Sequence, residues 1–191
     1  MSAPRIPLLS VEDSKKAAAL AGIPEAFAPL SVFRMLLRHP ELTRAVADLL
    51  QMLLRGTHLD GRLRELIIMR IGWATGSVYE WTQHWRIARL IGMEDADILG
   101  VRDWRSHNGY SPAERAVLAA TDDTLESGAI SAATWRECDA HVGGPEALLE
   151  LVVAIGNWSL FSSLLRSLEV PLEDGTEPWP PDGVVPKRSK S

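Results

Sequence analysis

Four polar side chains interrupt a mostly apolar stretch over residues 62–92, and their types fit acid–base chemistry: Glu65, Ser77, Glu80 and His84. On a helix, Glu80 and His84 lie one turn apart on the same face, so their side chains can reach each other. A nearby carboxylate raises the pKa of an imidazole, whereas burial lowers it. A histidine placed in this way can therefore transfer protons near neutral pH.

Glu65 lies in the apolar run that precedes the other three residues, directly before the four apolar residues 66–69. A buried carboxylate among such residues is unfavourable unless a partner compensates its charge. Three side chains could supply that partner: His84, Arg64 and Arg70. Gly72 shares the helical stripe of Glu65, and its missing side chain would let another backbone or a ligand approach closely.

Each of the four residues also has a structural explanation. Ser77 and Glu80 match the Ser-x-x-Glu capping box, in which the two side chains satisfy backbone amides at the start of a helix. His84 could be a hydrogen-bonded core histidine, and Glu65 could serve only as an ion-pair partner. The convergence of all four on one helix junction is what favours a functional site.

The elements that position these residues are expected to be helices. Apolar residues recur at helical spacing, caps recur at the segment ends, and no segment alternates as a strand would. The expected helices cover residues 11–21, 31–38, 41–55, 62–73, 77–91, 111–127, 131–142 and 146–168, with a short turn-like segment at 94–101. The sequence therefore predicts an all-α fold of about seven or eight helices, built on a central helical hairpin joined at residues 74–76.

Proline and tryptophan mark further features of the chain. Prolines exclude a helix from most of the C-terminal tail, residues 171–191. Trp179 lies between two of these prolines, and we expect it to dock on its own domain or on a neighbouring subunit. Three tryptophans of the central stretch are expected to anchor the core or to wall an apolar pocket: Trp73, Trp81 and Trp85.

The composition excludes several classes of protein. With 191 residues, of which 46% are hydrophobic, the chain is expected to form one all-α domain over residues 1–191. Its net charge of −5, with both signs interspersed, predicts no nucleic-acid partner and no membrane partner. A single cysteine, Cys138, excludes an intramolecular disulfide and any two-cysteine redox cycle within one chain.

The sequence carries no signal for targeting, for a metal or for a cofactor. The N-terminal residues lack the apolar run of a signal peptide, and no uninterrupted apolar segment of about 18 residues occurs, so we expect a cytoplasmic protein. No His-x3-His or Glu-x2-His pair predicts a metal site, and no glycine-rich loop predicts a nucleotide. The expected partner is a small-molecule substrate, and no cofactor is expected.

Three segments resemble the carboxymuconolactone decarboxylase family, whose other branch is the AhpD-like alkylhydroperoxidases. They are Arg-Glu-Leu-Ile-Ile at 64–68, Thr-Gly-Ser-Val-Tyr-Glu-Trp-Thr-Gln-His at 75–84 and Arg-Ile-Ala-Arg-Leu-Ile-Gly at 86–92. The recognisable core covers residues 40–125. The resemblance implies an AhpD-like helical fold, a homo-oligomer that is commonly a trimer or hexamer, and a role in aromatic compound catabolism.

The peroxidase branch of this family has the pattern Glu-x11-Cys-x2-Cys-x3-His. Glu65 and His84 fall on its proton-relay positions, and Ser77 and Glu80 fall on the positions of its two cysteines. A serine hydroxyl cannot reduce a peroxide, and a carboxylate cannot resolve a sulfenic acid. Alkylhydroperoxidase activity is therefore the least favoured function.

The decarboxylase branch removes CO2 from a carboxylated lactone without a cofactor. By this resemblance His84 would donate the proton, Glu80 would hold and tune His84, and Glu65 would orient it or bind a water. Either Arg64 or Arg70 would meet the substrate anion. Two carboxylates next to an anionic substrate repel it unless one is protonated or paired.

These observations lead to two main hypotheses of different classes. The first is a cofactor-free enzyme that decarboxylates, or transfers a proton on, a small carboxylated or lactone metabolite. The alternative is a non-catalytic family member that binds a small molecule or serves as an oligomeric scaffold. The enzyme hypothesis predicts a pocket at the junction of the two central helices, lined by Glu65, His84 and tryptophans. The non-catalytic alternative predicts that Glu65 and His84 pair only with structural groups and that no open cavity reaches them.

Overall fold

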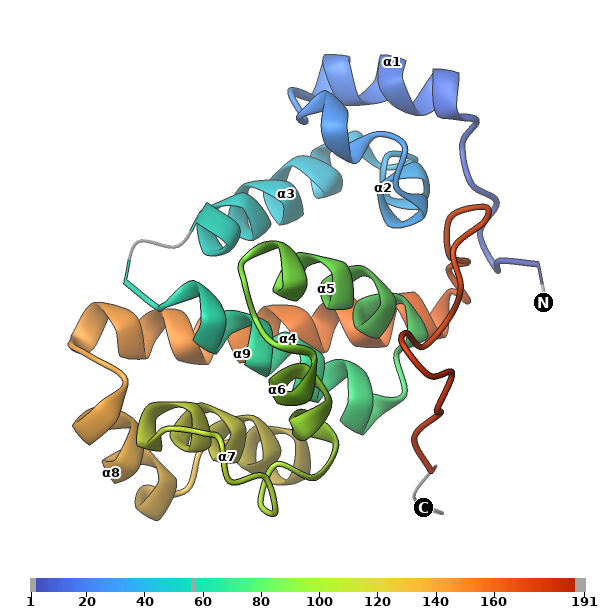
Figure 1. Cartoon of the computed structure of the whole chain (residues 1–191). Helices are drawn as coiled ribbons and strands as arrows, with labels where there is room; N and C mark the ends of the chain where they lie inside the picture. Colours follow the sequence, from blue (N-terminus) through green and yellow to red (C-terminus); the bar gives the residue numbers. More distant parts are fainter. Residues whose placement is uncertain (1–2, 56–57, 188–191) are drawn as a thin grey trace. The chain divides into compact units, whose positions relative to one another are not determined.

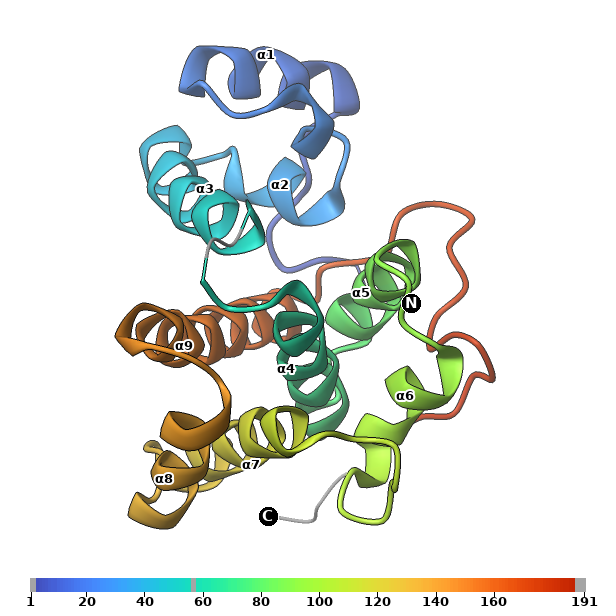
Figure 2. The same cartoon turned by 60° about the vertical axis from the view of Figure 1, so that its left-hand side comes forward.

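The computed structural model describes residues 3–55 and 58–187, and in these residues the chain forms nine α-helices, two short 3-10 helices and no strand (Figures 1 and 2). The elements are α1 (Val11–Ala21), η1 (Glu25–Phe27), α2 (Ser31–Leu36), α3 (Pro40–Arg55), α4 (Gly61–Thr75), α5 (Val78–Leu90), α6 (Asp95–Gly100), η2 (Val101–Asp103), α7 (Pro112–Ser127), α8 (Ala132–His141) and α9 (Pro145–Ser167). The predicted all-α class is confirmed. The helix count exceeds the expected range by one, because the segment expected as turn-like at residues 94–101 forms α6, a helix of six residues.

Local capping signals set most helix ends. The side chains of Ser10, Asp60, Ser111 and Ser131 each accept a hydrogen bond from a first-turn amide. Ser111 forms a complete capping box with Glu114. Helix α4 ends at Gly76, whose φ of 72° is the left-handed conformation that glycine adopts without strain.

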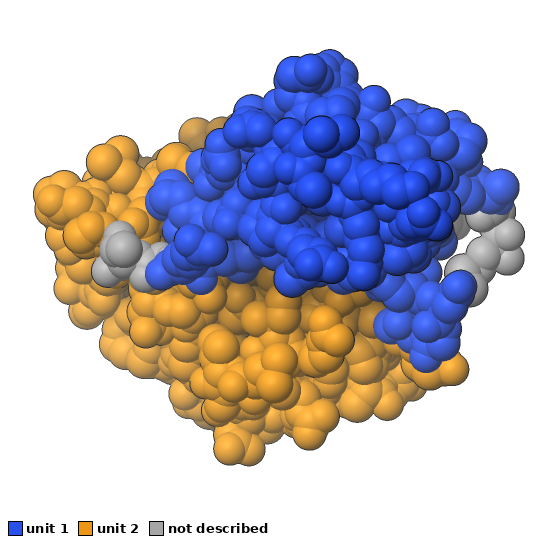
Figure 3. All heavy atoms as spheres, turned by 90° about the horizontal axis from the view of Figure 1, so that it is seen from above, with its two compact units in different colours: residues 1–55, 163–176 blue, residues 56–162, 177–191 orange. Residues whose placement is uncertain are grey.

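The chain divides into two compact units, which Figure 3 shows in different colours. Unit one comprises residues 1–55 and 163–176, and unit two comprises residues 56–162 and 177–191. In unit one, α1 packs against α2 and α3. Its buried Ser14 hydroxyl donates to the Ala28 carbonyl at 2.6 Å. A single domain over the whole chain remains a prediction.

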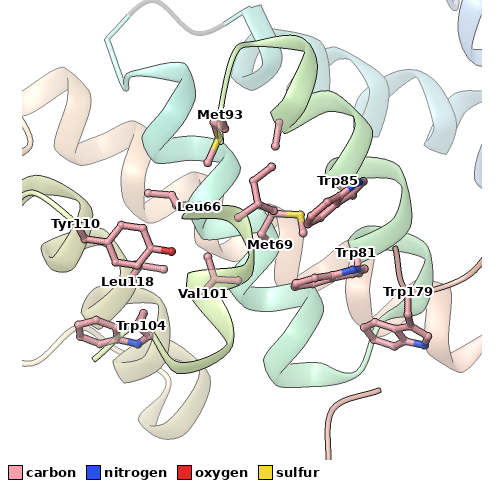
Figure 4. Packing of buried hydrophobic residues seen from close by; sticks show 12 residues of the cluster. Leu66, Met69, Trp81, Trp85, Met93, Val101, Trp104, Tyr110, Leu118 and Trp179 are labelled. Atoms are coloured by element: carbon pink, nitrogen blue, oxygen red, sulfur yellow. The ribbon is translucent and has the colours of Figure 1, made fainter. Parts of the chain in front are cut away.

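Unit two contains all four candidate residues and is organised around α4. This helix packs against α5 and α7, and α7 packs in turn against α8. Side chains are buried around nearly the whole circumference of α4, from Leu63 through Met69 and again at Ile71. Figure 4 shows Leu66 and Met69 of this helix beside Trp81 and Trp85 of α5, in one apolar cluster.

The tail in unit two has no helix in its described part, up to residue 187, and it docks on α5. Trp179 is buried, and its ring lies 6.0 Å from that of Trp81 and 6.1 Å from that of Trp73. The Trp81 indole N–H donates to the Pro180 carbonyl at 2.8 Å. Of the two expected docking surfaces, the structure therefore places Trp179 on its own chain.

Helix α9 is long and apolar enough to cross a membrane by length and composition alone, with a mean hydropathy of 1.6 over its most apolar window. Glu150 interrupts this segment, so the sequence contains no uninterrupted apolar run there. Half of the same window is buried inside the structure, at 50%. A core helix of a soluble protein has these properties too, and α9 is therefore weak evidence for a membrane span.

Candidate functional site

Glu65 and His84 form the shortest contact of the candidate site. Glu65 on α4 is fully buried, and its Oε2 lies 2.7 Å from Nδ1 of His84 on α5. The other carboxylate oxygen accepts from Nε of Arg64 at 3.3 Å. Two of the three predicted partners of Glu65 are therefore in place.

Arg70, the third predicted partner, is engaged elsewhere. Its Nε donates to Oδ1 of Asp122 on α7 at 2.6 Å, and its Nη1 donates to the Val101 carbonyl at 3.0 Å. Both contacts tie α4 to the elements that follow it in the sequence. Arg64, and not Arg70, therefore lies beside Glu65 and His84.

Glu80 completes a row with the other two residues. Its Oε2 lies 3.5 Å from Nε2 of His84, one helical turn along α5. The imidazole therefore lies between two carboxylates, with Glu65 at Nδ1 and Glu80 at Nε2. The expectation that Glu80 holds His84 is only partly met, because Glu65 makes the closer contact.

Burial and charge act on Glu80 and His84 in different ways. Burial raises the pKa of Glu80 to about 7; the charge of Glu65 adds to this rise and the His84 charge opposes it. Burial disfavours the charged form of His84, but the Glu65 carboxylate and its hydrogen bond outweigh burial, with help from Glu80, and the pKa of His84 is raised. Both shifts favour the protonated forms, and the pKa of about 7 lets Glu80 gain or lose a proton near neutral pH.

Ser77 occupies the N-cap position of α5, but its side chain does not cap the helix. The predicted capping box is wrong for two reasons. The Ser77 N–H already donates to the Gly72 carbonyl at 2.9 Å, and the Glu80 carboxyl lies beside His84. The Ser77 hydroxyl is buried, at 1% exposure of the residue, and has no hydrogen-bond partner in the described structure.

Gly72 allows the two helices of the hairpin to meet closely, as its position predicts. A Cβ atom at this position would lie 3.1 Å from the backbone nitrogen of Trp81 and 3.5 Å from Cβ of Glu80. Contacts of 3.1 Å are tighter than nearly all Cβ contacts in proteins. It is therefore the backbone of α5 that approaches Gly72.

The tryptophans of the central stretch take the first of their two expected roles, as core anchors. Trp81 and Trp85 belong to the apolar cluster, and Trp73 packs against it, so these three rings act as core anchors. The ring that faces the imidazole is Trp158 of α9, whose plane lies edge-on to His84 at 6.1 Å and 87°. The sequence does not single out Trp158, because its position depends on the packing of α9 and not on a local motif.

The remaining chemical groups lie apart from this row. Cys138 on α8 is buried, and burial raises the pKa of its thiol to about 11, so it is a poor nucleophile. Across residues 3–55 and 58–187, no cluster of three His, Cys, Asp or Glu side chains could hold a metal ion. Glu65, His84 and Glu80 are the titratable side chains that this site brings together.

The all-helical fold around this central hairpin is similar to that of AhpD-like structures. Residues 40–123 match the model of the carboxymuconolactone decarboxylase family. All four candidate residues lie within the matched segment. A comparison with curated protein sequences gives no match.

Solved structures share the fold at low sequence identity. A peroxidase-related protein from Ralstonia eutropha, described as an alkylhydroperoxidase AhpD core, superposes with a TM-score of 0.72 at 17% identity, over 91% of this chain and 94% of that chain. A variant of the debrominase Bmp8 in complex with 2,3,4-tribromopyrrole gives 0.70 at 19% identity, over 91% and 94%. A peroxidase-related protein from Silicibacter sp. TM1040 gives 0.71 at 13% identity, over 92% of each chain.

Proposed function

We propose that this protein is a cofactor-free enzyme that decarboxylates, or transfers a proton on, a small carboxylated or lactone metabolite. The observation that carries the proposal is the buried imidazole of His84 between Glu65 at 2.7 Å and Glu80 at 3.5 Å. A buried carboxyl with a pKa of about 7 matches a general acid that works near neutral pH. The carboxy-lyase reaction type comes from the family resemblance.

The charges at the site favour an anionic substrate. Glu65 is negative, and it is balanced by the positive charges of Arg64 and His84. When Glu80 is protonated and His84 is charged, Arg64 and His84 together outweigh the charge of a Glu65 carboxylate. The repulsion between two carboxylates and a substrate anion, which the sequence raised as a difficulty, is thereby removed.

Decarboxylation at this site would need only proton transfer from the protein. Loss of CO2 breaks a carbon–carbon bond and leaves its electron pair on the substrate, delocalised onto the lactone carbonyl oxygen as an enolate. Glu80, and not His84 as the resemblance implies, then donates its proton to carbon and becomes a carboxylate. His84 returns a proton to Glu80 from Nε2, Glu65 stabilises the imidazolium, and the relay finally takes a proton from solvent.

The related structures support a small ring as the ligand class. The debrominase Bmp8 variant, which has the same fold, binds 2,3,4-tribromopyrrole. A lactone of five ring atoms has a similar size and shape. Aromatic compound catabolism is the pathway class that fits such a substrate.

The proposal is tested by a decarboxylation assay with carboxymuconolactone and the variant His84→Ala. We expect turnover by the natural protein, and loss of turnover with a native circular dichroism spectrum in the variant. The matched control is His141→Ala, because His141 also lies one turn after a glutamate, 3.7 Å from Glu137, but on the surface. Turnover that is unchanged in His84→Ala would contradict the proposal.

The other two hypotheses predict different results in the same experiments. A non-catalytic member would bind a small lactone without converting it. An alkylhydroperoxidase would consume peroxide with a thiol reductant, which we do not expect from a chain with Ser77 and Glu80 at the thiol positions. Peroxide consumption that appears only in Ser77→Cys/Glu80→Cys would identify a proton relay that lacks its thiols.

We further propose a cytoplasmic homo-oligomer, a trimer or a hexamer. The part of α9 in unit two exposes several large apolar side chains: Leu149, Val152, Val153 and Leu160. With Trp135 of α8, some of them line an apolar cavity of about 500 Å³. Light scattering should give a multiple of the chain mass, and Leu149→Glu/Val153→Glu should reduce it, whereas the exposed Leu90→Glu should not.

A further inference from the structure

The Ser77 hydroxyl is a buried polar group whose presence the fold does not explain. It has no hydrogen-bond partner, and the residue is 1% exposed. A buried hydroxyl without a partner destabilises the folded state, and most buried hydroxyls therefore have one. Four other N-cap side chains of this chain bond the amides of their helices, so the cap position alone does not require a free hydroxyl.

Ser77 continues the row formed by the acid–base residues. It precedes Glu80 by three residues and His84 by seven, so it lies at the N-cap of the helix whose one face carries both of them. Side chains three residues apart on a helix are about 5–6 Å apart at Cβ. This spacing is comparable to the width of a small ring.

The electrostatic setting at Ser77 favours a negative oxygen. The N-terminus of α5, a helix of 13 residues, carries the positive end of the helix dipole. A hydroxyl that is already desolvated can donate to an oxyanion without first losing a protein partner. The unsatisfied hydroxyl is thus a preorganised donor.

We propose that the Ser77 hydroxyl binds the substrate's lactone carbonyl oxygen and stabilises it as that oxygen becomes an enolate. This inference rests on the proposed function and assigns a substrate contact to it. When the carbon–carbon bond to CO2 breaks, the electron pair moves onto this oxygen, and Ser77 donates a hydrogen bond to it. The pair returns to carbon when Glu80 delivers its proton, and the hydroxyl of Ser77 keeps its own proton throughout.

Kinetics of Ser77→Ala and Ser77→Gly test the role in turnover. Because the interaction strengthens only as charge develops, we expect kcat to fall by about 100-fold, with KM changed less than about threefold. The matched control is Ser131→Ala, which removes a real cap that accepts from the Thr134 N–H at 3.2 Å. It should lower Tm by about 2–4 °C and leave kcat unchanged, whereas Ser77→Ala should not lower Tm.

Binding of tetronate tests Ser77 independently of turnover. Tetronate is the anion of tetronic acid, a five-membered lactone with a stable enolate, and its affinity can be measured by calorimetry. We expect the natural protein to bind it, and Ser77→Ala to bind it about 10- to 100-fold more weakly, as for a lost hydrogen bond to a charged group. Ser131→Ala should bind it like the natural protein.

The outcomes separate this inference from the proposed function. Equal tetronate affinity in the natural protein and in folded Ser77→Ala, or no tetronate binding at all, would overturn the role of Ser77. Decarboxylation that persists in Ser77→Ala at the natural rate would also overturn it while leaving the reaction in place. Tetronate binding that depends on Ser77, in a protein without decarboxylase activity, would keep the oxyanion site and reject the reaction.

Discussion

His84 contacts two carboxylates that differ in distance and burial, and this difference divides their roles. Glu65 is fully buried, is held by Arg64 and lies 2.7 Å from the imidazole. Glu80 lies 3.5 Å away at the other ring nitrogen, and its pKa of about 7 makes it the carboxyl that changes charge near neutrality. Glu65 therefore positions the imidazole, and Glu80 exchanges the proton.

The pH dependence of turnover should report Glu80. A general acid acts when protonated, so kcat should be highest below about pH 7 and should fall as pH rises through that value. Glu80→Gln cannot donate the proton, and we expect kcat to fall by about 100-fold or more and to lose this inflection. Glu137→Gln is the control, since Glu137 pairs with His141 at the surface. A natural profile that is flat through neutrality would contradict this role.

The Glu80 carboxyl should also make the free energy of unfolding depend on pH. Its folded-state pKa is raised, so the folded protein keeps a proton that the unfolded chain releases. The stabilisation is complete below the ordinary value of 4.5 and is lost as pH rises through about 7. The free energy of unfolding in urea should therefore fall over this window in the natural protein, and it should fall less in Glu80→Gln.

Glu65→Gln should affect the charge of His84 as well as the fold. The change removes the negative charge that Arg64 and His84 share, so the pKa of His84 should fall, as measured by NMR titration of the imidazole. Loss of one partner of a buried ion pair should lower the free energy of unfolding by about 3–5 kcal/mol.

A surface histidine–glutamate pair provides the control for Glu65→Gln. His39 and Glu41 lie 3.4 Å apart with side chains 66% and 85% exposed. Glu41→Gln should therefore change stability by less than about 1 kcal/mol. Equal stability losses in the two variants would mean that burial of Glu65 does not determine its contribution.

At the scale of helices, the close crossing of α4 and α5 sets the position of Glu80. Gly72→Ala would place Cβ 3.1 Å from the Trp81 backbone nitrogen, so α5 would have to move. We expect the free energy of unfolding to fall by about 1–3 kcal/mol, together with a loss of turnover. Gly156→Ala is the matched helical control, because its Cβ would meet no atom within 4 Å. It should raise stability by about 0.5–1 kcal/mol.

Helices were predictable because their signals are local. The Ser111 cap, the proline at 112 and Glu114 lie within four residues of one another, and the structure places a complete capping box there. Expected and observed bounds of α7 agree for the same reason. Long-range contacts were harder to predict. The sequence indicated that Trp179 docks on a surface, but it did not indicate that Trp179 packs against Trp81.

The candidate site shows where a local motif misleads. Ser77 and Glu80 have the spacing of a capping box, but other contacts prevent the box from forming. The Ser77 N–H donates to the Gly72 carbonyl, and the Glu80 carboxyl lies beside His84. The convergence of Glu65 and His84 was predictable from their types and helical faces. Which carboxylate lies closer to the imidazole depends on how α4 packs against α5, and no spacing rule encodes it.

At the scale of the whole molecule, residues of the C-terminal tail pack against the helical part of unit two. Asp182 of the tail accepts two hydrogen bonds from the Arg102 guanidinium, at 2.7 Å and 2.9 Å. The same guanidinium lies over the rings of Trp73 and Trp81, at 4.7 Å and 4.9 Å from their centroids. The hydrogen bonds from Arg102 lower the pKa of Asp182 to about 2, so this link should persist in mild acid.

Trp179→Ala should therefore destabilise unit two far more than an exposed tryptophan change would. Trp179 is 8% exposed and packs against two other indoles, and its loss should lower the free energy of unfolding by about 3–5 kcal/mol. Trp135→Ala, at 40% exposure on α8, should lower it by about 1 kcal/mol or less. Urea unfolding followed by circular dichroism measures both, because it does not depend on the number of indoles. Similar losses in the two variants would mean that the tail contributes no more to stability than a surface contact, and that residues 177–187 are not part of the folded core of unit two.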